Sequence, residues 1–221
     1  MQTAGLEWER RLWKEGYKRV VGVDEAGRGP LAGPVVAAAV YFPRSLIEEK
    51  IPEELEGLTD SKRLTERRRN KFFEVLHKLE GVEIGVGLAE PEIIDRWNIV
   101  EATYLAMVRA LCQLPEKADY ILIDGRSAPK LNVPTQAIVK GDQQSLSIAA
   151  ASVIAKVTRD RIMLELDEDY PYYGFRRHKG YPTQEHLDAL RRFGPTRVHR
   201  LSFRSIHRIV EQYGPWPWPM R

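Results

Sequence analysis

The chain alternates between short β-branched hydrophobic runs and longer segments in which hydrophobic residues recur every three or four positions. The runs predict strands at about 19–24, 34–42, 82–89, 120–125 and 135–139. The longer spacing predicts helices at about 6–16, 65–79, 91–97, 100–114, 145–169, 183–192 and 203–213. We expect the second strand to pair antiparallel with the first and the later strands to follow through helical crossovers. This order indicates an α/β fold with a mixed five-stranded sheet flanked by helices and a C-terminal helical region.

The composition is that of a globular protein, with 43% hydrophobic and 29% charged residues in a chain of 221. This length fits one domain, and no apolar run approaches the roughly 20 residues of a membrane span. Residues 1–18 lack the apolar centre of a signal peptide, and a single cysteine excludes an internal disulfide framework. We therefore expect a cytoplasmic protein, and since nothing in the sequence suggests an obligate partner chain, we expect a monomer. We expect Cys112 to be a packing residue of a helix, and the Pro-Trp stretch 215–219 to pack on the domain, with a partner-binding motif as the alternative.

The net charge is only +3, but many basic residues gather in three groups. The groups are Lys62, Arg63, Arg67, Arg68, Arg69 and Lys71; Arg176, Arg177, His178 and Lys179; and Arg197, His199, Arg200, Arg204, His207 and Arg208. A solvated helix face is the better explanation for any one group alone. Three groups in a chain that also carries apolar-flanked acids favour a nucleic-acid partner.

The hydrophobic run 20–23 ends on two adjacent carboxylates, Asp24 and Glu25, and passes into the turn Gly27-Arg28-Gly29. Carboxylates at the end of a buried strand must be paired, protonated or bound to a metal. The glycines allow another backbone to approach closely, and the arginine between them can bind phosphate through two hydrogen bonds. The alternative is an ordinary solvated turn in which Arg28 pairs with one of the two acids.

Two later strands are also followed by acids, Asp124 and Asp142. Because ligands of such sheets lie at the carboxyl ends of the parallel strands, we expect Asp24, Asp124 and Asp142 to converge. Together with Glu25 they form a set of oxygen donors suited to Mg²⁺ or Mn²⁺. Two such ions roughly 4 Å apart can activate water and stabilise a leaving oxygen. The set therefore predicts hydrolysis of a phosphodiester to a 3′-hydroxyl and a 5′-phosphate.

Several motifs occur in one order along the chain, at 23–38, 60–64, 123–125, 140–142, 149–161, 178–183 and 199–203. In order and spacing they resemble those of bacterial type 2 ribonuclease H (ribonuclease HII). The resemblance covers nearly the whole chain and implies a ribonuclease H-like fold. It implies one type 2 domain over 1–221, with a catalytic core at about 18–170 and a helical substrate-binding region at about 171–214.

The resemblance also implies cleavage of RNA in RNA–DNA hybrids and incision on the 5′ side of a single ribonucleotide embedded in duplex DNA. The metal-binding carboxylates would be Asp24, Glu25, Asp124 and Asp142. The turn Gly27-Arg28-Gly29 would grip the ribonucleotide through backbone contacts to its 2′-hydroxyl, the group that distinguishes RNA from DNA. Tyr181 would lie against the sugar of the adjoining deoxynucleotide. We assign phosphate contacts to Ser61, Lys62, His178 and Lys179.

Two other functions have to be distinguished from this one. A proofreading 3′→5′ exonuclease of the same superfold also uses four acids, but its first strand would normally carry Asp-x-Glu, whereas Asp24 and Glu25 are adjacent. A non-catalytic hybrid-binding module would have lost one or more acids, and all four are present. The adjacent pair and the complete set favour the type 2 nuclease.

Overall fold

The computed structural model describes residues 3–213, which form two compact units. The first unit comprises the residues up to Ala26, Val36–Leu88 and Tyr104–Val157. The second comprises Gly27–Val35, Ala89–Thr103 and the residues from Thr158 onward. The chain thus passes from the first unit to the second directly after β1. The Pro-Trp stretch 215–219 lies outside the described residues.

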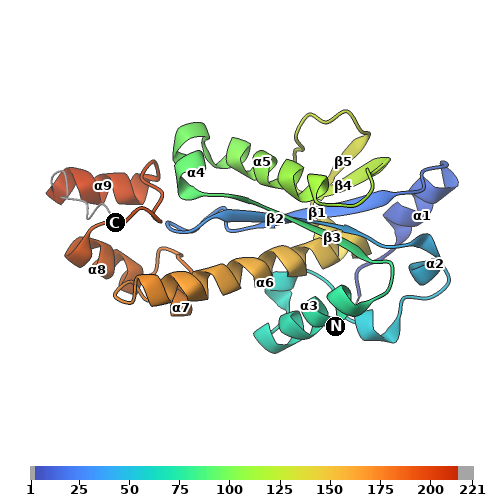
Figure 1. Ribbon diagram of the computed structural model, residues 1–221, viewed down its shortest axis with the longest axis horizontal. Coiled ribbons are helices and arrows are strands. Elements are labelled where there is room, and N and C mark those ends of the chain that lie inside the picture. The colour runs from blue at the N-terminus through green and yellow to red at the C-terminus, as the bar shows by residue number, and fades with distance from the viewer. Residues whose placement is uncertain (1–2, 214–221) are drawn as a thin grey trace. The chain divides into compact units, whose positions relative to one another are not determined.

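The elements follow the predicted order (Figure 1). The strands are β1 (Val20–Ala26), β2 (Val35–Tyr41), β3 (Glu83–Ala89), β4 (Tyr120–Asp124) and β5 (Thr135–Ile138). The α-helices are α1 (Glu7–Lys14), α2 (Arg44–Ile47), α3 (Glu66–Lys78), α4 (Pro91–Trp97), α5 (Ile99–Cys112), α6 (Leu146–Asp169), α7 (Phe175–His178), α8 (Gln184–Phe193) and α9 (Arg204–Tyr213). The short 3₁₀ turns are η1 (Glu53–Leu55), η2 (Ser61–Arg63) and η3 (Gly141–Gln143).

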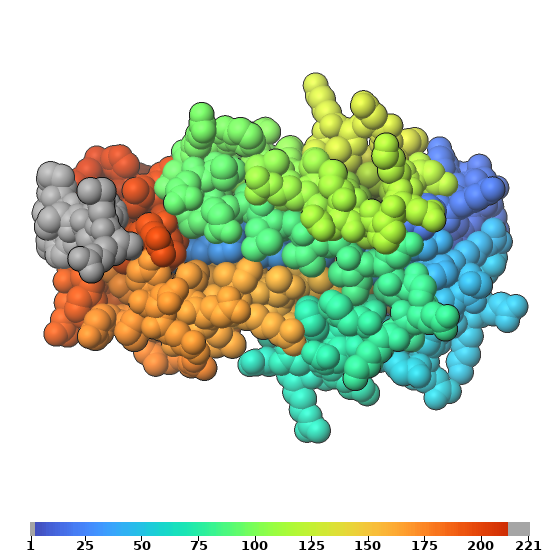
Figure 2. All heavy atoms as spheres, viewed as in Figure 1, coloured from blue at the N-terminus to red at the C-terminus, as the bar shows by residue number. Residues whose placement is uncertain are grey.

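The five strands form one sheet in the order β3-β2-β1-β4-β5. Strand β1 pairs antiparallel with β2 and parallel with β4, and β4 pairs parallel with β5. The predicted mixed sheet is therefore confirmed. Figure 1 shows α5 and α6 on opposite faces of this sheet, and in Figure 2 helical side chains leave only a narrow strip of the strands visible.

Helix α6 packs against β1 at unusually short range. A Cβ atom at Gly22 would lie 2.2 Å from the backbone carbon of Ser147, so no larger residue fits there without a shift of the helix. The first turns of α6 are buried and belong to the main hydrophobic core, together with residues of α1, α3, β1, β2 and β4. This contact anchors the strand that carries Asp24.

A buried acid of α1 caps α6. The Glu9 side chain is 1% exposed, and its Oε1 accepts hydrogen bonds from Ser145 Oγ at 2.6 Å, Ser147 Oγ at 2.7 Å and Ser147 N at 3.1 Å. These partners lie at the start of α6, where backbone N–H groups lack partners inside the helix. Burial raises the pKa of Glu9, although its hydrogen bonds to the two serines lower it. The sequence pattern, which predicted only a helix at about 6–16, did not reveal this role.

One smaller expectation was wrong. Cys112 is exposed rather than packed, because α5 buries Ala102, Ala106 and Ala110 and a residue two positions later points to another side of the helix.

The second unit has a hydrophobic core of its own, to which α6, α7, α8 and α9 contribute. Its buried residues are Leu31, Ala32, Met163, Tyr173, Phe175, Ala189, Leu190, Ile206 and Ile209. The segment that follows β1 is therefore built into the C-terminal helices and is not a free loop. Within residues 3–213, no helix is both long enough and apolar enough to cross a membrane.

Candidate active site

Three aspartates of the first unit meet at the carboxyl ends of the parallel strands. Asp24 lies in β1, Asp124 ends β4, and Asp142 lies in η3 after β5. One carboxylate oxygen from each lies within 4.8 Å of the others. Since β1, β4 and β5 are parallel neighbours, their carboxyl ends lie at the same edge. The structure thus brings together three of the four carboxylates that the sequence singled out.

A tight turn places Asp142 beside Asp124. Lys140 adopts a left-handed backbone conformation with φ of 56°, and the chain turns from β5 into η3. The N–H of Gly141 then donates a hydrogen bond of 2.7 Å to Asp124 Oδ1. This bond fixes the carboxylate of Asp124 and the start of η3 with respect to each other.

Glu25 is adjacent to Asp24 but does not join the closest group. It is half-buried, and in the described residues the group of three acids whose oxygens all lie within 4.8 Å of one another is formed by the aspartates. Successive side chains of a strand point to opposite faces, which separates Glu25 from Asp24. Its backbone N–H nevertheless donates to Asp24 Oδ1 at 2.6 Å. Its assignment as a metal ligand stays a prediction.

Burial and neighbouring charges raise the pKa of two of these carboxyl groups. Burial raises the pKa of Asp24 well above its ordinary value, and the charges of Glu25 and Asp124 raise it further. Burial and the charges of Asp124 and Asp60 raise the pKa of Asp142 to about 7. Oxygen donors that repel one another in a buried site fit a divalent cation, which would offset their charge.

Lys62 and Asp60 adjoin this group. Burial lowers the pKa of the Lys62 ammonium, but the charges of the surrounding acids outweigh burial and the net shift is upward. Those acids are Asp24, Asp60, Asp142 and Asp124. The Asp60 carboxylate accepts a hydrogen bond of 2.8 Å from Lys62 N and also contacts Asp142. The motif that contains Asp60 did not reveal a role for this residue, although it stands beside Ser61 and Lys62 in a loop with apolar flanks.

Ser61 is buried, and its hydroxyl is hydrogen bonded to Ser152 Oγ at 2.8 Å. Ser152 lies on α6, and its hydroxyl also contacts the Asp24 carboxyl and lowers the pKa of that acid. The Ser61 side chain is therefore engaged with a residue that orients Asp24. Its predicted contact with phosphate stays a prediction, as does that of Lys62.

The other predicted site residues lie in the second unit. Tyr181 is 41% exposed, and a Cβ atom built on Gly29 would lie 3.6 Å from Cε1 of its ring. The ring therefore adjoins the turn Gly27-Arg28-Gly29. The Leu31 N–H donates to the Gly180 carbonyl at 2.8 Å, which ties the two segments together through their backbones.

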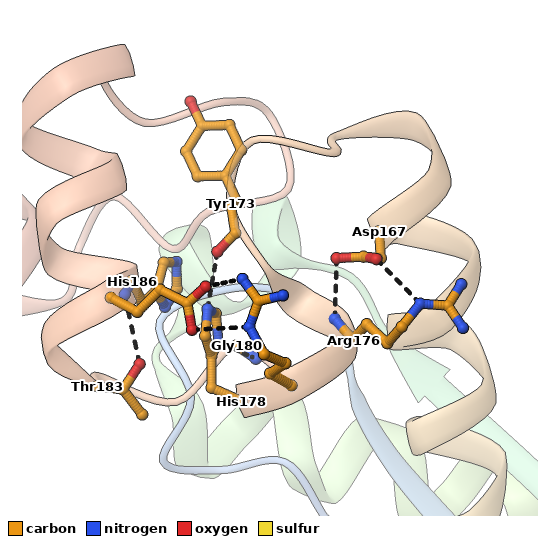
Figure 3. A network of polar contacts seen from close by, with 9 residues as sticks. Asp167, Tyr173, Arg176, His178, Gly180, Thr183 and His186 are labelled. Carbon is orange, nitrogen blue, oxygen red and sulfur yellow. Dashed lines mark hydrogen bonds and ion pairs between the residues drawn. The ribbon is translucent and has the colours of Figure 1, made fainter.

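His178 and Lys179 precede Tyr181, and both form hydrogen bonds with other groups of the protein. The His178 ring is buried, its Nε2 lies 2.7 Å from the Tyr173 carbonyl, and its Nδ1 accepts from Gly180 N at 3.2 Å (Figure 3). Burial lowers the pKa of His178, which favours the neutral ring. The Lys179 carbonyl accepts a hydrogen bond of 3.0 Å from Arg159. The phosphate contacts assigned to this pair stay predictions.

Two further buried histidines extend this network. Nδ1 of His199 accepts from Thr196 N at 2.9 Å, so its proton is on Nε2, which lies 3.1 Å from Nε2 of His186. The proton of His186 must then be on Nδ1, which lies 3.0 Å from the Tyr181 carbonyl. The chain of bonds requires both rings to be neutral and ends on the backbone of Tyr181. Burial lowers the pKa of His186 to about 4 and that of His199 well below its ordinary value.

His199 and Arg200 were expected in a basic surface group, and the structure shows that this expectation was wrong. They are 1% and 0% exposed. For Arg200, sequence alone could not reveal this, because its side chain finds its hydrogen-bond partners in Gly27, Arg28 and Gly33, which are distant in the chain. The partners of His199 are nearer in the chain, at Thr196 and His186.

Known proteins similar to this chain point to one family. A model of the ribonuclease HII family matches residues 21–206. The chain is 50% identical over 205 residues to the ribonuclease HII of Geobacillus thermodenitrificans, covering 93% of this chain and 76% of that protein. It is 48% identical over 205 residues to the ribonuclease HII of Geobacter sulfurreducens, covering 93% and 91%.

A solved structure agrees. The ribonuclease H2 from Pyrococcus horikoshii OT3 matches with a TM-score of 0.72 and 30% identity, over 88% of this chain and 98% of that one. The expected ribonuclease H-like fold is thereby confirmed, with the acidic group at the edge of its sheet. From the family match and these likenesses, the chain belongs to the ribonuclease HII family, the metal-dependent endoribonucleases that hydrolyse RNA in RNA–DNA hybrids.

Proposed function

We propose that this enzyme also incises duplex DNA on the 5′ side of a single embedded ribonucleotide and leaves a 3′-hydroxyl and a 5′-phosphate. The observation that carries the proposal is the convergence of Asp24, Asp124 and Asp142, whose oxygens lie within 4.8 Å of one another. Such cuts would start the removal of ribonucleotides from DNA and of RNA primers during replication. We further propose that the enzyme acts as a cytoplasmic monomer.

The four acids, Asp24, Glu25, Asp124 and Asp142, would hold two Mg²⁺ or Mn²⁺ ions. When bound, the ions supply an activated water and stabilise the leaving 3′ oxygen. The protein contributes the orientation of the carboxylates, since Ser152 contacts Asp24 and the N–H of Gly141 holds Asp124. The Lys62 ammonium lies among these charges and is suited to a phosphate of the substrate.

Recognition of the ribonucleotide would fall to the second unit. The backbone of Gly27-Arg28-Gly29 would contact the 2′-hydroxyl, which only RNA carries. Tyr181, whose ring adjoins Gly29, would lie against the sugar of the next deoxynucleotide. Lys179 and His178 would contact phosphates from the same loop, and Ser61 with Lys62 would do so from the first unit.

The test is cleavage of an end-labelled DNA duplex that contains one ribonucleotide, in Mg²⁺ and in Mn²⁺, by the wild type and by Asp124→Asn. We expect one incision 5′ to the ribonucleotide by the wild type and its loss in the variant. The matched substrate is the same duplex with deoxyribose at that position, which should stay intact. Size-exclusion chromatography with light scattering tests the monomer.

Other outcomes would point to other functions. Cutting of the all-DNA duplex, or progressive shortening from a 3′ end, would favour an exonuclease. Tight binding of the ribonucleotide duplex without cleavage in either metal would favour a binding module. Cleavage confined to long RNA–DNA hybrids would agree with the activity of the family but would contradict the proposed incision at single ribonucleotides.

A further inference from the structure

Two buried guanidinium groups hold the segment that follows β1. Arg159 of α6 and Arg200, which follows the bridge between Ala32 and His199, are 1% and 0% exposed. Within the part of the chain that the structure describes, neither forms an ion pair with a carboxylate. Burial lowers the pKa of Arg159 to about 10 and that of Arg200 to about 9, so both remain charged near neutral pH.

Arg200 binds the backbone of this segment at both of its ends. Its Nη2 donates to the Gly27 carbonyl at 2.6 Å and to the Gly33 carbonyl at 2.8 Å, and its Nε donates to Gly33 at 3.0 Å. Its Nη1 donates to the Arg28 carbonyl at 3.0 Å. A planar guanidinium can serve three carbonyls in this way because its donors form a rigid fork.

These bonds determine where the neighbouring N–H groups point. The described peptide bonds are trans, and in a trans peptide the C=O and the following N–H point in opposite directions. With the carbonyls of Gly27 and Arg28 directed at Arg200, the N–H groups of Arg28 and Gly29 are directed away from it. The clamp therefore presents two adjacent backbone donors on the opposite side of the turn.

The second guanidinium explains why the turn begins with glycine. Gly27 has φ of 96°, and a Cβ atom there would lie 2.0 Å from Nε of Arg159. Arg159 in turn donates to the carbonyls of Ala32 at 2.9 Å, Pro34 at 3.0 Å and Lys179 at 3.0 Å. The turn is thus held by one guanidinium on its carbonyls and packed closely against the other.

Arg200 is itself fixed from two directions. Its N–H donates to the Leu31 carbonyl at 2.8 Å, so its backbone is bound to the segment that its side chain holds. Asp95 of α4 accepts from Leu201 N at 2.8 Å, Ser202 N at 2.9 Å and Ser202 Oγ at 2.6 Å, which anchors the residues directly after it.

We propose that Arg200 is the positioning residue for recognition of the ribose 2′-hydroxyl, because it orients the backbone donors of Gly27-Arg28-Gly29. It acts through the turn and needs no contact with the substrate. This inference rests on the proposed recognition of a single ribonucleotide by that turn. It adds a residue whose loss should weaken the discrimination between ribose and deoxyribose more than the general affinity for a duplex.

The test compares Arg200→Lys with Arg191→Lys, an equal change at an exposed arginine of α8 that pairs with Asp188. Lysine keeps the charge but cannot donate to three carbonyls in one plane. Both changes are made in the Asp124→Asn background, so that substrate binds without being cut. The probes are a labelled DNA duplex with one ribonucleotide and the same duplex with deoxyribose there, in Mg²⁺.

We measure discrimination as the dissociation constant of the all-DNA duplex divided by that of the ribonucleotide duplex. We expect Arg200→Lys to lower this ratio at least about tenfold, since hydrogen bonds from the charged guanidinium to the turn are lost. Affinity for the all-DNA duplex should change less than about twofold, because the charge is kept. A ratio equal to that of Arg191→Lys, in a variant whose circular dichroism and melting match the wild type, would overturn the proposal.

If Arg200→Lys does not fold, Asp95→Asn replaces it. Asparagine keeps the size and one acceptor oxygen but removes the charge. The hydrogen bonds that hold the turn after Arg200 are therefore weakened, and no cavity is left. We expect the ratio to fall in the same direction by a smaller factor, and an unchanged ratio in this folded variant would count against the proposal.

The amide NMR spectrum separates this inference from the function on which it rests. A wild type that neither prefers nor cuts the ribonucleotide duplex would refute the proposed function. The orienting role would still predict shifted amide resonances for Arg28, Gly29 and Gly33 in Arg200→Lys and unshifted ones in Arg191→Lys. Unshifted resonances in both variants would refute the orienting role whatever the activity.

Discussion

Two regions of this protein gather like charges in buried surroundings, and they balance those charges in opposite ways. In the first unit, Asp24, Asp124 and Asp142 face one another, and burial and mutual repulsion raise the pKa values of Asp24 and Asp142. In the second unit, the guanidinium groups of Arg159 and Arg200 are buried without a carboxylate partner among the described residues, yet each donates to three backbone carbonyls.

The difference separates a site that needs a ligand from one that needs none. Carboxylates only accept hydrogen bonds when ionised, so neighbouring carboxylates cannot satisfy one another without a cation or a proton. Guanidinium groups only donate, and backbone carbonyls supply the acceptors that they need. We expect the acidic site to lower the stability of the metal-free fold and the arginine sites to raise it, as sites of binding and of structure do in general.

The largest expected effect is on activity. Asp124→Asn should lower kcat/KM for an RNA–DNA hybrid at least about a thousandfold, because a charged oxygen ligand is lost at the metal site. Initial rates with a fluorescent hybrid measure this. Cys112→Ser, at an exposed residue of α5, is the matched control and should cut at the wild-type rate. Activity within tenfold of the wild type in Asp124→Asn would remove this acid from the site.

The next largest effect is on stability. In the second unit, removal of a buried charge should destabilise the fold, whereas removal of an acid from the metal-free acidic site should not. Arg159→Met removes the donor for the carbonyls of Ala32, Pro34 and Lys179 and leaves them buried. We expect the free energy of unfolding to fall by about 3 kcal/mol, since each unsatisfied carbonyl carries a desolvation cost. Urea denaturation measures it, with Arg191→Met as the exposed control. Equal stabilities of the two variants would show that the carbonyls do not depend on Arg159.

The neutral histidines should make the second unit sensitive to acid. Burial lowers the pKa of His186 to about 4 from the ordinary 6.5, so the unfolded state binds a proton first as the pH falls. The free energy of unfolding should therefore decrease between about pH 6.5 and pH 4, by up to about 3 kcal/mol from this ring. In His186→Asn that part of the decrease should be absent. A parallel pH profile for both proteins would contradict the assignment of a neutral ring.

Metal binding should follow the protonation of the acidic site. The pKa of Asp142 is about 7, and a cation must displace its proton. Below pH 7 the apparent affinity for Mg²⁺ or Mn²⁺ should fall by about tenfold per pH unit. Calorimetry in two buffers of different ionisation enthalpy would detect the released proton at pH 6. Equal enthalpies in both buffers would mean that Asp142 is already ionised.

The sequence could predict features that depend on local pattern, and it could not predict roles that depend on contacts between distant segments. The β-branched runs that end at Asp24 and Asp124 identified β1, β4 and their acids, because strand periodicity and the carboxyl-end rule depend on local pattern. The roles of Asp60 and Glu9 were missed, since both act on segments far away in the chain. Arg200 was taken for a surface residue because hydropathy assigns arginine to solvent and cannot show that carbonyls from another segment surround it.

The measurement that tests the contrast most directly is the melting temperature of the wild type and of Asp142→Asn, each in EDTA and in Mg²⁺. Removing one of the mutually repelling carboxylates should make the variant melt at the same temperature as the wild type or above it in EDTA. Mg²⁺ should then raise the melting temperature of the wild type and leave that of the variant nearly unchanged. A variant that melts well below the wild type in EDTA would contradict the account, because the acidic group would then stabilise the fold without a metal.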